Sequence, residues 1–97
     1  MSLNIAEIMS AGYRDARGEQ SYIVTGYLPV ITFAYNYNIF NVGNDKISTG
    51  SIETTLEITT NNSIKKDSVI RFDGKIYKAA IIKDYYSAVK VFLSLVK

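Results

Sequence analysis

The stretch 64-IKKDSVIRFDGKIYKAAIIKDY-85 contains two apolar segments that are separated by the pair Asp73-Gly74. A two-residue turn of type I′ needs positive φ at both central positions, which Gly adopts freely and Asp tolerates. The twist of this turn also matches the twist of the strands on either side of it. The stretch therefore predicts a β-hairpin in which residues 67–73 pair with residues 75–83, and in which Asp73 and Gly74 have a structural role.

Upstream of this hairpin, the segment 51-SIETTLEIT-59 alternates strictly between two sets of side chains. The set that would face a core is Ile52, Thr54, Leu56 and Ile58. The set that would face water is Glu53, Thr55, Glu57 and Thr59. A period of two sustained over this length is typical of a strand with one buried and one exposed face.

Two further segments have strand-like composition. The segment 21-SYIVTGYLPVITFAYNY-37 is rich in residues that favour a pleated surface. Pro29 has no amide donor, so it should divide this segment into two strands or lie on a sheet edge, and Gly26 indicates a bulge or a bend. The segment 85-YYSAVKVFLSLVK-97 fits a strand or a helix, and its three valines favour a strand.

The signals in two other segments are weaker. Residues 1–20 combine loosely helical apolar spacing with a polar, glycine-bounded stretch, so we expect an N-terminal arm or a short helix there. Residues 41–50 are polar and glycine-rich, and they form a longer connection than the usual hairpin loop of about 2–5 residues. A long loop of this kind is either functional or a tolerated insertion.

Together these segments predict an all-β fold: a small antiparallel β-barrel or sandwich of about six strands over residues 21–97. The 97 residues of the chain suit one domain with a single core. The longest apolar run, 88-AVKVFLSLV-96, is too short for a membrane helix, which needs about 18–20 residues. We therefore expect no membrane partner.

The residue types that are missing restrict the chemistry. The chain contains no His, no Cys and no Trp, which excludes thiolate zinc sites, histidine general bases, histidine-dependent triads and disulfides. Its glycines are scattered, and no phosphate-binding glycine motif occurs. We accordingly expect a protein that is not an enzyme and that uses no cofactor or metal.

The charges are distributed unevenly along the chain. Residues 1–64 hold three Lys or Arg residues against six Asp or Glu residues, whereas residues 65–97 hold eight against three. Such polarity can create two faces of opposite sign on one small domain, and the alternative is a set of spaced solubilising charges. No dense Lys/Arg run of the kind that binds nucleic acid is present.

The eight tyrosines of the chain suggest a binding surface. Tyrosine is common at protein interfaces because its ring is apolar and its hydroxyl is polar, although it is also an ordinary strand residue. Proteins that bind single-stranded nucleic acid combine a basic groove with aromatic stacking platforms on small barrels. Tyr77, Lys83, Tyr85 and Tyr86 are therefore candidates for a protein interface, with base stacking as the alternative.

The run 64-IKKDSVIRFDGKIYKAAIIKDYYSAVKVFLSLVK-97 resembles the head-tail joining proteins of tailed bacteriophages, also called head-closure, adaptor or stopper proteins. The C-terminal half of that family commonly reads as a strand, an Asp/Gly turn, a Lys-x-Tyr strand, a polar turn and a final apolar strand. Here the Lys-x-Tyr element begins at Lys75, and the final strand is 88-AVKVFLSLV-96. The resemblance extends loosely over residues 21–60.

This resemblance implies a small β-barrel that assembles as a homo-oligomeric ring between the portal or adaptor protein and the tail protein of a phage or prophage virion. The ring would continue the DNA channel without reading the DNA sequence, and its subunits would be made in the host cytoplasm before they join the virion neck. A segment that faces the channel would be sought in residues 41–50, with Gly43, Asn44, Asp45 and Lys46 as candidates. The alternatives are a small barrel that binds single-stranded nucleic acid and a tail-completion or other virion assembly protein.

Overall fold

The computed structural model of the protein describes residues 4–44 and 47–96. Within these ranges the chain forms strands and turns but no helix, which confirms the expected all-β fold. The strands are β1 (Asn4–Arg14), β2 (Gln20–Val30), β3 (Thr32–Ala34), β4 (Asn38–Asn44), β5 (Ile47–Thr54), β6 (Leu56–Thr60), β7 (Val69–Phe72), β8 (Lys75–Asp84) and β9 (Val89–Leu95). The described residues thus include no helix that could span a membrane.

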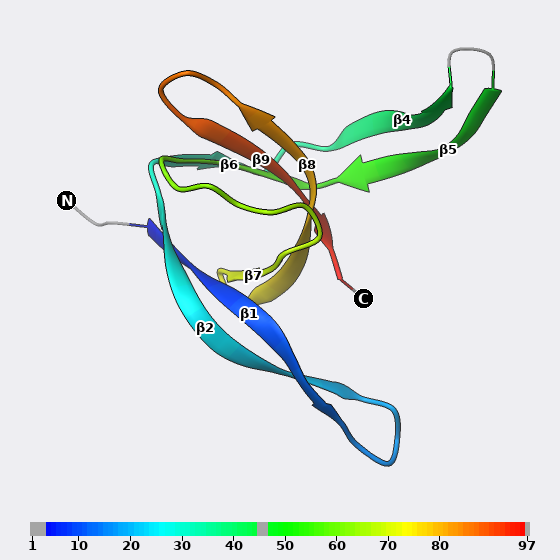
Figure 1. The fold of residues 1–97 in the computed structure, drawn as a ribbon, viewed down its shortest axis with the longest axis vertical. Helices are drawn as coiled ribbons and strands as arrows, with labels where there is room; N and C mark the ends of the chain where they lie inside the picture. The colour runs from blue at the N-terminus through cyan, green and yellow to red at the C-terminus, as the bar shows by residue number, and fades with distance from the viewer. Residues whose placement is uncertain (1–3, 45–46, 97) are drawn as a thin grey trace.

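Seven strands form one antiparallel sheet in the order β2-β1-β7-β8-β9-β6-β3, and β4 pairs with β5 in a separate two-stranded ribbon. In this sheet β2 and β3 lie at opposite edges, although Ile31 alone separates them in the sequence. The two edges must therefore meet at this corner, where the Ile31 amide donates to the Thr59 carbonyl oxygen at 2.8 Å. As a result the sheet curls into a half-barrel (Figure 1).

The hydrophobic core fills the inside of this half-barrel. Its buried members are Ala6, Leu28, Val30, Leu56, Ile58, Ile70, Phe72, Tyr77, Ala79, Val89, Val91 and Leu93. The predicted alternation is confirmed, because Thr54, Leu56 and Ile58 are fully buried. The predicted single strand is nevertheless interrupted at Thr55, since β5 leaves the sheet to pair with β4 while β6 pairs with β9 and β3.

The β7–β8 hairpin has the predicted turn and register. Phe72 pairs with Lys75, as a two-residue turn requires. Asp73 and Gly74 adopt φ angles of 52° and 76°, which are the positive values of a type I′ turn. The C-terminal segment forms strand β9, so the interpretation of this segment as a strand is confirmed.

Residues 4–14 form strand β1 in the interior of the sheet, between β2 and β7, so the expectation of an arm or short helix is wrong. The burial of β1 explains the misleading sequence pattern. Ala6 and Met9 are buried and Ile8 packs against the core, so the shielded apolar residues of this strand do not alternate. Ile8 pairs with Gly26 but Met9 pairs with Val24, so β2 bulges at this point. The predicted bulge near Gly26 and the edge position of Pro29 on β2 are confirmed.

Residues 41–50 do not form the expected long loop, because most of them are paired in β4 and β5. The register shifts after Val42, and Gly43 and Gly50 adopt positive φ angles of 139° and 156°. These glycines therefore mark an irregularity within a β-ribbon, although in the sequence they look like turn signals. The channel candidates Asp45 and Lys46 lie outside the described residues.

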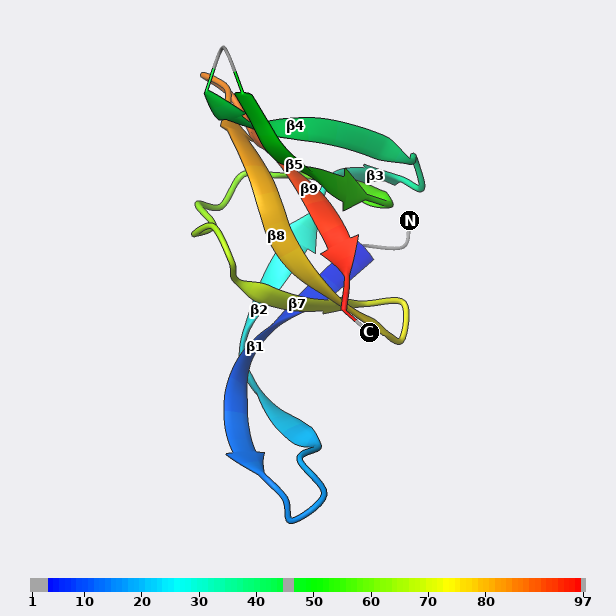
Figure 2. The same cartoon turned by 90° about the vertical axis from the view of Figure 1, so that its right-hand side faces the viewer.

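Two hairpins project from the half-barrel, as Figures 1 and 2 show. We call residues 10–24 the β1–β2 arm, because beyond Met9 strand β1 pairs with β2 and no longer with β7. We call residues 38–54 the β4–β5 arm. The Cα radius of gyration is 14.5 Å, whereas a compact chain of about 100 residues has a radius of about 13 Å. The chain is thus less compact than a typical domain of this length.

Candidate protein interface

The described surface carries many exposed large apolar and aromatic side chains. They are Ile5, Tyr13, Ile23, Tyr27, Ile31, Phe33, Tyr35, Tyr37, Ile39, Tyr85, Tyr86, Leu95 and Val96. Single exposed apolar residues are normal, whereas groups of them mark interaction sites. Three of these side chains, Ile5, Phe33 and Tyr35, line one hollow of the surface.

We call this hollow the aromatic cleft. It has a volume of about 330 Å³ and is lined by Asn4, Ile5, Phe33, Tyr35, Phe72 and Asp73. These residues come from the start of β1, from β3 and the residue after it, and from the β7–β8 turn. The ring of Phe33 makes edge contacts with Phe72 and Tyr35, at centroid distances of 5.0 and 5.7 Å. Phe72 is buried, while Phe33 and Tyr35 are 40% and 53% exposed, so a partner could reach their rings.

The polar groups of the cleft are Tyr35 and Asp73. The Tyr35 hydroxyl donates a hydrogen bond to Asp73 Oδ2 at 3.2 Å. Partial burial raises the pKa of Tyr35 above 10.0, and the hydrogen bond to Asp73 raises the pKa further, so the phenol stays protonated at neutral pH. Within the described residues Asp73 makes no ion pair. The cleft therefore presents a carboxylate beside aromatic rings.

The tip of the β1–β2 arm, residues 15–19, is ordered by its own hydrogen bonds. Asp15 Oδ1 accepts from the amides of Arg17 and Glu19, both at 2.9 Å. Gly18 has a φ of 85° and donates its amide to the Asp15 carbonyl oxygen at 3.0 Å. Arg14 and Arg17 are exposed, and neither makes an ion pair with another described residue. The tip thus offers two guanidinium groups on a structured turn.

Gly12 and Ser21 allow a pair of cross-strand hydrogen bonds near the tip of the β1–β2 arm. The Ser21 hydroxyl accepts from the Tyr13 amide at 3.2 Å and donates to the Tyr13 carbonyl oxygen at 2.9 Å. A Cβ atom at position 12 would lie 2.6 Å from Ser21 Oγ, so Gly12 leaves room for this hydroxyl. The two bonds span the register shift between Ala11 and Arg14. They therefore stabilise the irregular backbone just before the tip.

The β4–β5 arm is attached to the outer face of the half-barrel. The Phe40 ring contacts the Phe92 ring edge-on at 5.0 Å, which leaves Phe92 only 6% exposed. The Lys83 ammonium lies 5.5 Å from the centroid of the Phe92 ring. Ser94 Oγ donates to the Glu53 carbonyl oxygen at 2.6 Å, which ties β9 to β5. This end of the arm is therefore a small second core on the opposite face of β9.

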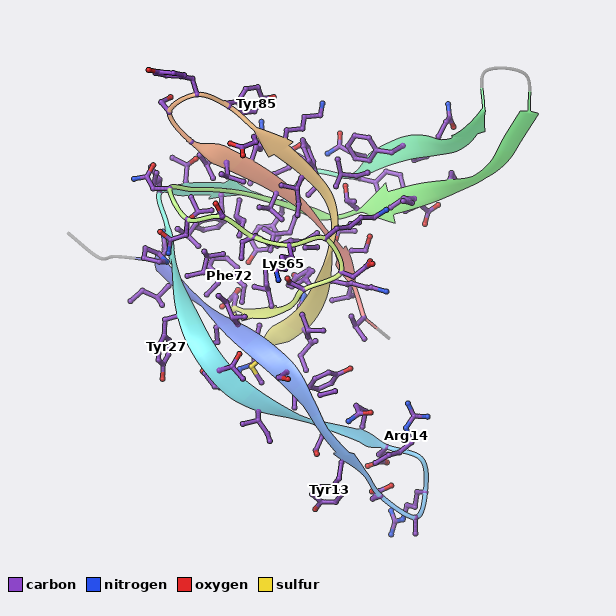
Figure 3. All side chains as sticks on the ribbon, viewed as in Figure 1. Tyr13, Arg14, Tyr27, Lys65, Phe72 and Tyr85 are labelled. Carbon is purple, nitrogen blue, oxygen red and sulfur yellow. The ribbon has the colours of Figure 1, made fainter. Side chains whose placement is uncertain are left out.

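The predicted interface residues occupy different environments. Tyr77 is a core residue with 2% exposure, so the prediction that it lies in an interface is wrong. Its position follows from the turn register, which places Tyr77 opposite the buried Ile70. Lys83 lies against the Phe40–Phe92 pair. Tyr85 and Tyr86 are highly exposed in the turn between β8 and β9, where Figure 3 labels Tyr85.

Ion pairs join the two oppositely charged halves of the chain. Arg71 Nη2 lies 2.7 Å from Glu7 Oε1, and Lys90 Nζ lies 3.3 Å from Glu57 Oε2. In both pairs the acid comes from residues 1–64 and the base from residues 65–97. Folding thus brings part of the excess charge of each half next to the other half.

The aromatic cleft was not anticipated from the sequence, because its lining is assembled from three distant segments. The one signal for it is the apolar alternation of Ile31, Phe33 and Tyr35 after the edge proline. Asp73 has the predicted turn role and also lines the cleft. Gly43 and Asn44 lie at the end of β4, and their role in a channel stays a prediction.

Comparison with known proteins assigns no family to the chain. No protein-family model matches the sequence. No curated protein matches it either.

Among the residues that the structure describes, no group of three or more carboxylates is arranged to hold a metal ion.

Proposed function

We propose that the protein is a structural component of the connector between the head and the tail of a phage or prophage virion. Several copies would form a ring between the portal or adaptor protein and the tail protein, and the ring would continue the DNA channel. The chain would be made in the host cytoplasm and would end in the virion neck. The proposal originates in the sequence resemblance, and the exposed surface of the fold supports it.

The observation that carries this proposal is the β1–β2 arm. A two-stranded hairpin is marginally stable on its own in water. This arm nevertheless extends past the last pairing of β1 with β7, and it leaves Tyr13 and Ile23 exposed by 75% and 59%. Contact with a second chain would bury these side chains and stabilise the ribbon. Head-to-tail contacts between identical subunits give a ring when the rotation between neighbours closes.

The mass of the purified chain in solution tests the proposal. We expect one discrete oligomer over a range of protein concentrations, and ring-shaped particles in electron micrographs. We also expect the oligomer to bind the portal or tail protein encoded beside it. A chain that stays monomeric at high concentration and binds neither protein would refute the connector role.

A second candidate function is binding of single-stranded nucleic acid, because Tyr85 and Tyr86 are exposed in the β8–β9 turn and Lys83 lies near the end of β8, just before this turn. Proteins that bind single strands place exposed aromatic rings, on which nucleobases stack, beside positively charged side chains. Titration with a single-stranded oligonucleotide at several salt concentrations separates the two functions. Binding that weakens steeply with salt and is lost in Tyr86→Ala, but not in Tyr13→Ala, supports this candidate. Absence of binding at low salt removes it.

A further inference from the structure

The aromatic cleft has the chemistry of a receptor for a cationic side chain. A guanidinium group is attracted to the faces of aromatic rings and forms charge-assisted hydrogen bonds with carboxylates. The cleft supplies the rings of Phe33 and Tyr35 and the carboxylate of Asp73, which has no ion-pair partner in the described ranges. Its volume of about 330 Å³ is at the lower limit of ligand pockets, which are about 300–1,000 Å³. The cleft therefore suits one or two side chains better than a large ligand.

The β1–β2 arm carries matching groups. Arg17 lies within the turn at the tip, and Arg14 ends strand β1 just before it. The neighbouring Asp15 uses its Oδ1 to accept two backbone amides of the turn, so this oxygen is directed at the turn itself. The hydrogen bonds of the turn also hold the tip in one shape, which lowers the entropy that binding would cost.

The arm and the cleft lie at different ends of the molecule. Figure 3 shows Tyr13 and Arg14 near the tip of the arm, far from the labelled Phe72. Figure 1 shows that the N-terminal end of β1, which lines the cleft, is on the opposite side from the tip. Two different patches at separate places on one subunit are what a head-to-tail contact between copies requires.

We propose that the tip of the β1–β2 arm of one copy inserts into the aromatic cleft of the next copy, with Arg17 stacked on Phe33 or Tyr35 and paired with Asp73. This contact specifies the subunit interface of the ring, so it rests on the proposed function. The occupant is a second copy of the chain because the same molecule carries both complementary surfaces. Burial of the cleft would also cover Ile5, which is 53% exposed in the single chain.

Two variants each disable one side of this contact. Arg17→Gln removes the guanidinium group proposed to enter the cleft and leaves the backbone amide that bonds Asp15. Asp73→Asn removes the charge of the cleft but keeps the turn, because Asn tolerates positive φ as Asp does. Lys66→Gln and Asp84→Asn make the same charge changes at exposed positions of the described chain outside both surfaces, and they serve as matched controls.

We expect Arg17→Gln and Asp73→Asn each to weaken self-association about tenfold or more, while the two controls assemble as the parent chain does. A decisive experiment mixes the two variants. Arg17→Gln retains an intact cleft and Asp73→Asn retains an intact arm, so an equimolar mixture should form one-to-one dimers and no larger species. Dimers of this kind also show that both variants are folded.

Three results would overturn the proposal. If both variants assemble as the parent chain does, this contact is wrong while the ring itself survives. If the controls weaken assembly as much as the two variants do, the effect is one of overall charge. If the parent chain is monomeric at high concentration, both the contact and the ring are refuted. The mass of the parent chain, measured first, thus distinguishes the two failures.

Discussion

Thr54, the last residue of β5, should limit the stability of the protein. Its side chain is completely buried. Its hydroxyl is the one buried side-chain polar atom without a hydrogen-bond partner in the described part of the chain. Thr54→Val replaces this hydroxyl with a methyl group and keeps the branched shape of the side chain. We therefore expect the substitution to stabilise the fold, although most core substitutions destabilise.

The magnitude follows from the cost of the unpaired group. A buried polar group without a partner costs about 1–3 kcal/mol. Removing it should raise the free energy of unfolding by a similar amount, because valine fits the same space. In a domain of 60–100 residues, about 1 kcal/mol corresponds to a change of about 4–8 °C in Tm. The expected change is therefore well within measurement.

Thr60 is the matched control. It is also completely buried, but its Oγ1 accepts a hydrogen bond from the Asn62 amide at 3.2 Å. Thr60→Val removes this bond and should lower the free energy of unfolding by about 0.5–1.5 kcal/mol. Both variants would be unfolded in urea at one fixed protein concentration, because self-association adds to apparent stability. Opposite signs for the two substitutions are the expected result.

The reasoning fails if Thr54→Val destabilises the protein to the same extent as Thr60→Val. That result would mean that the Thr54 hydroxyl has a partner in solution, such as a buried water. A change in the dependence of unfolding on urea would instead indicate a change in the unfolded state or in cooperativity, and the midpoint would then need calorimetric confirmation.

Three further predictions concern the turn, the β4–β5 arm and the buried tyrosine. Gly74→Ala should destabilise the protein by about 1–2 kcal/mol in urea unfolding, because the φ of 76° at this position is strained for alanine. No atom lies within 4 Å of the added Cβ, so a steric clash does not contribute to this cost. An unchanged midpoint would contradict a left-handed Gly74. Phe40→Ala should speed hydrogen exchange in the β4–β5 arm but not in the β1–β2 arm, since it removes the contact with Phe92; uniform acceleration would indicate global destabilisation. Burial, followed by the nearby Asp73, raises the pKa of Tyr77 above 10.0. The neutral phenol is favoured in the fold, so its contribution to stability is present below pH 10.0 and is lost as the pH rises through the raised pKa. Absorbance titration of the phenolate should show that Tyr77→Phe removes a group that ionises late; loss of a normally ionising group would refute this.

The exposed aromatic cleft and the projecting β1–β2 arm are features that a small barrel without partners would not need. Phe33, Tyr35 and Ile5 remain open to solvent although they lie together around one hollow. Such groups are more easily explained as contact surface than as part of a monomer. The proposed self-association accounts for the arm and the cleft together.

Features that depend on neighbouring residues were readable in the sequence. The positive φ angles of Asp73 and Gly74 follow from the residue types in the turn. This two-residue turn then determines that Phe72 pairs with Lys75. The alternation around Leu56 and Ile58 also predicted the buried face correctly. These properties are local, because a turn and a two-residue period involve adjacent positions.

Features that depend on bulges and on long-range pairing were decided by the tertiary structure. Strand β1 lacks the alternation of a half-buried strand because Ala6, Ile8 and Met9 are all shielded, and the irregularity at Gly43 makes a ribbon look like a loop. Phe92 points away from the main core, and it is buried because the ring of Phe40 on β4 packs against it. The aromatic cleft likewise exists because the chain turns at Ile31 and carries Phe33 and Tyr35 to the far edge of the sheet. Local preference specifies the strands, but the order in which they pair specifies the surface.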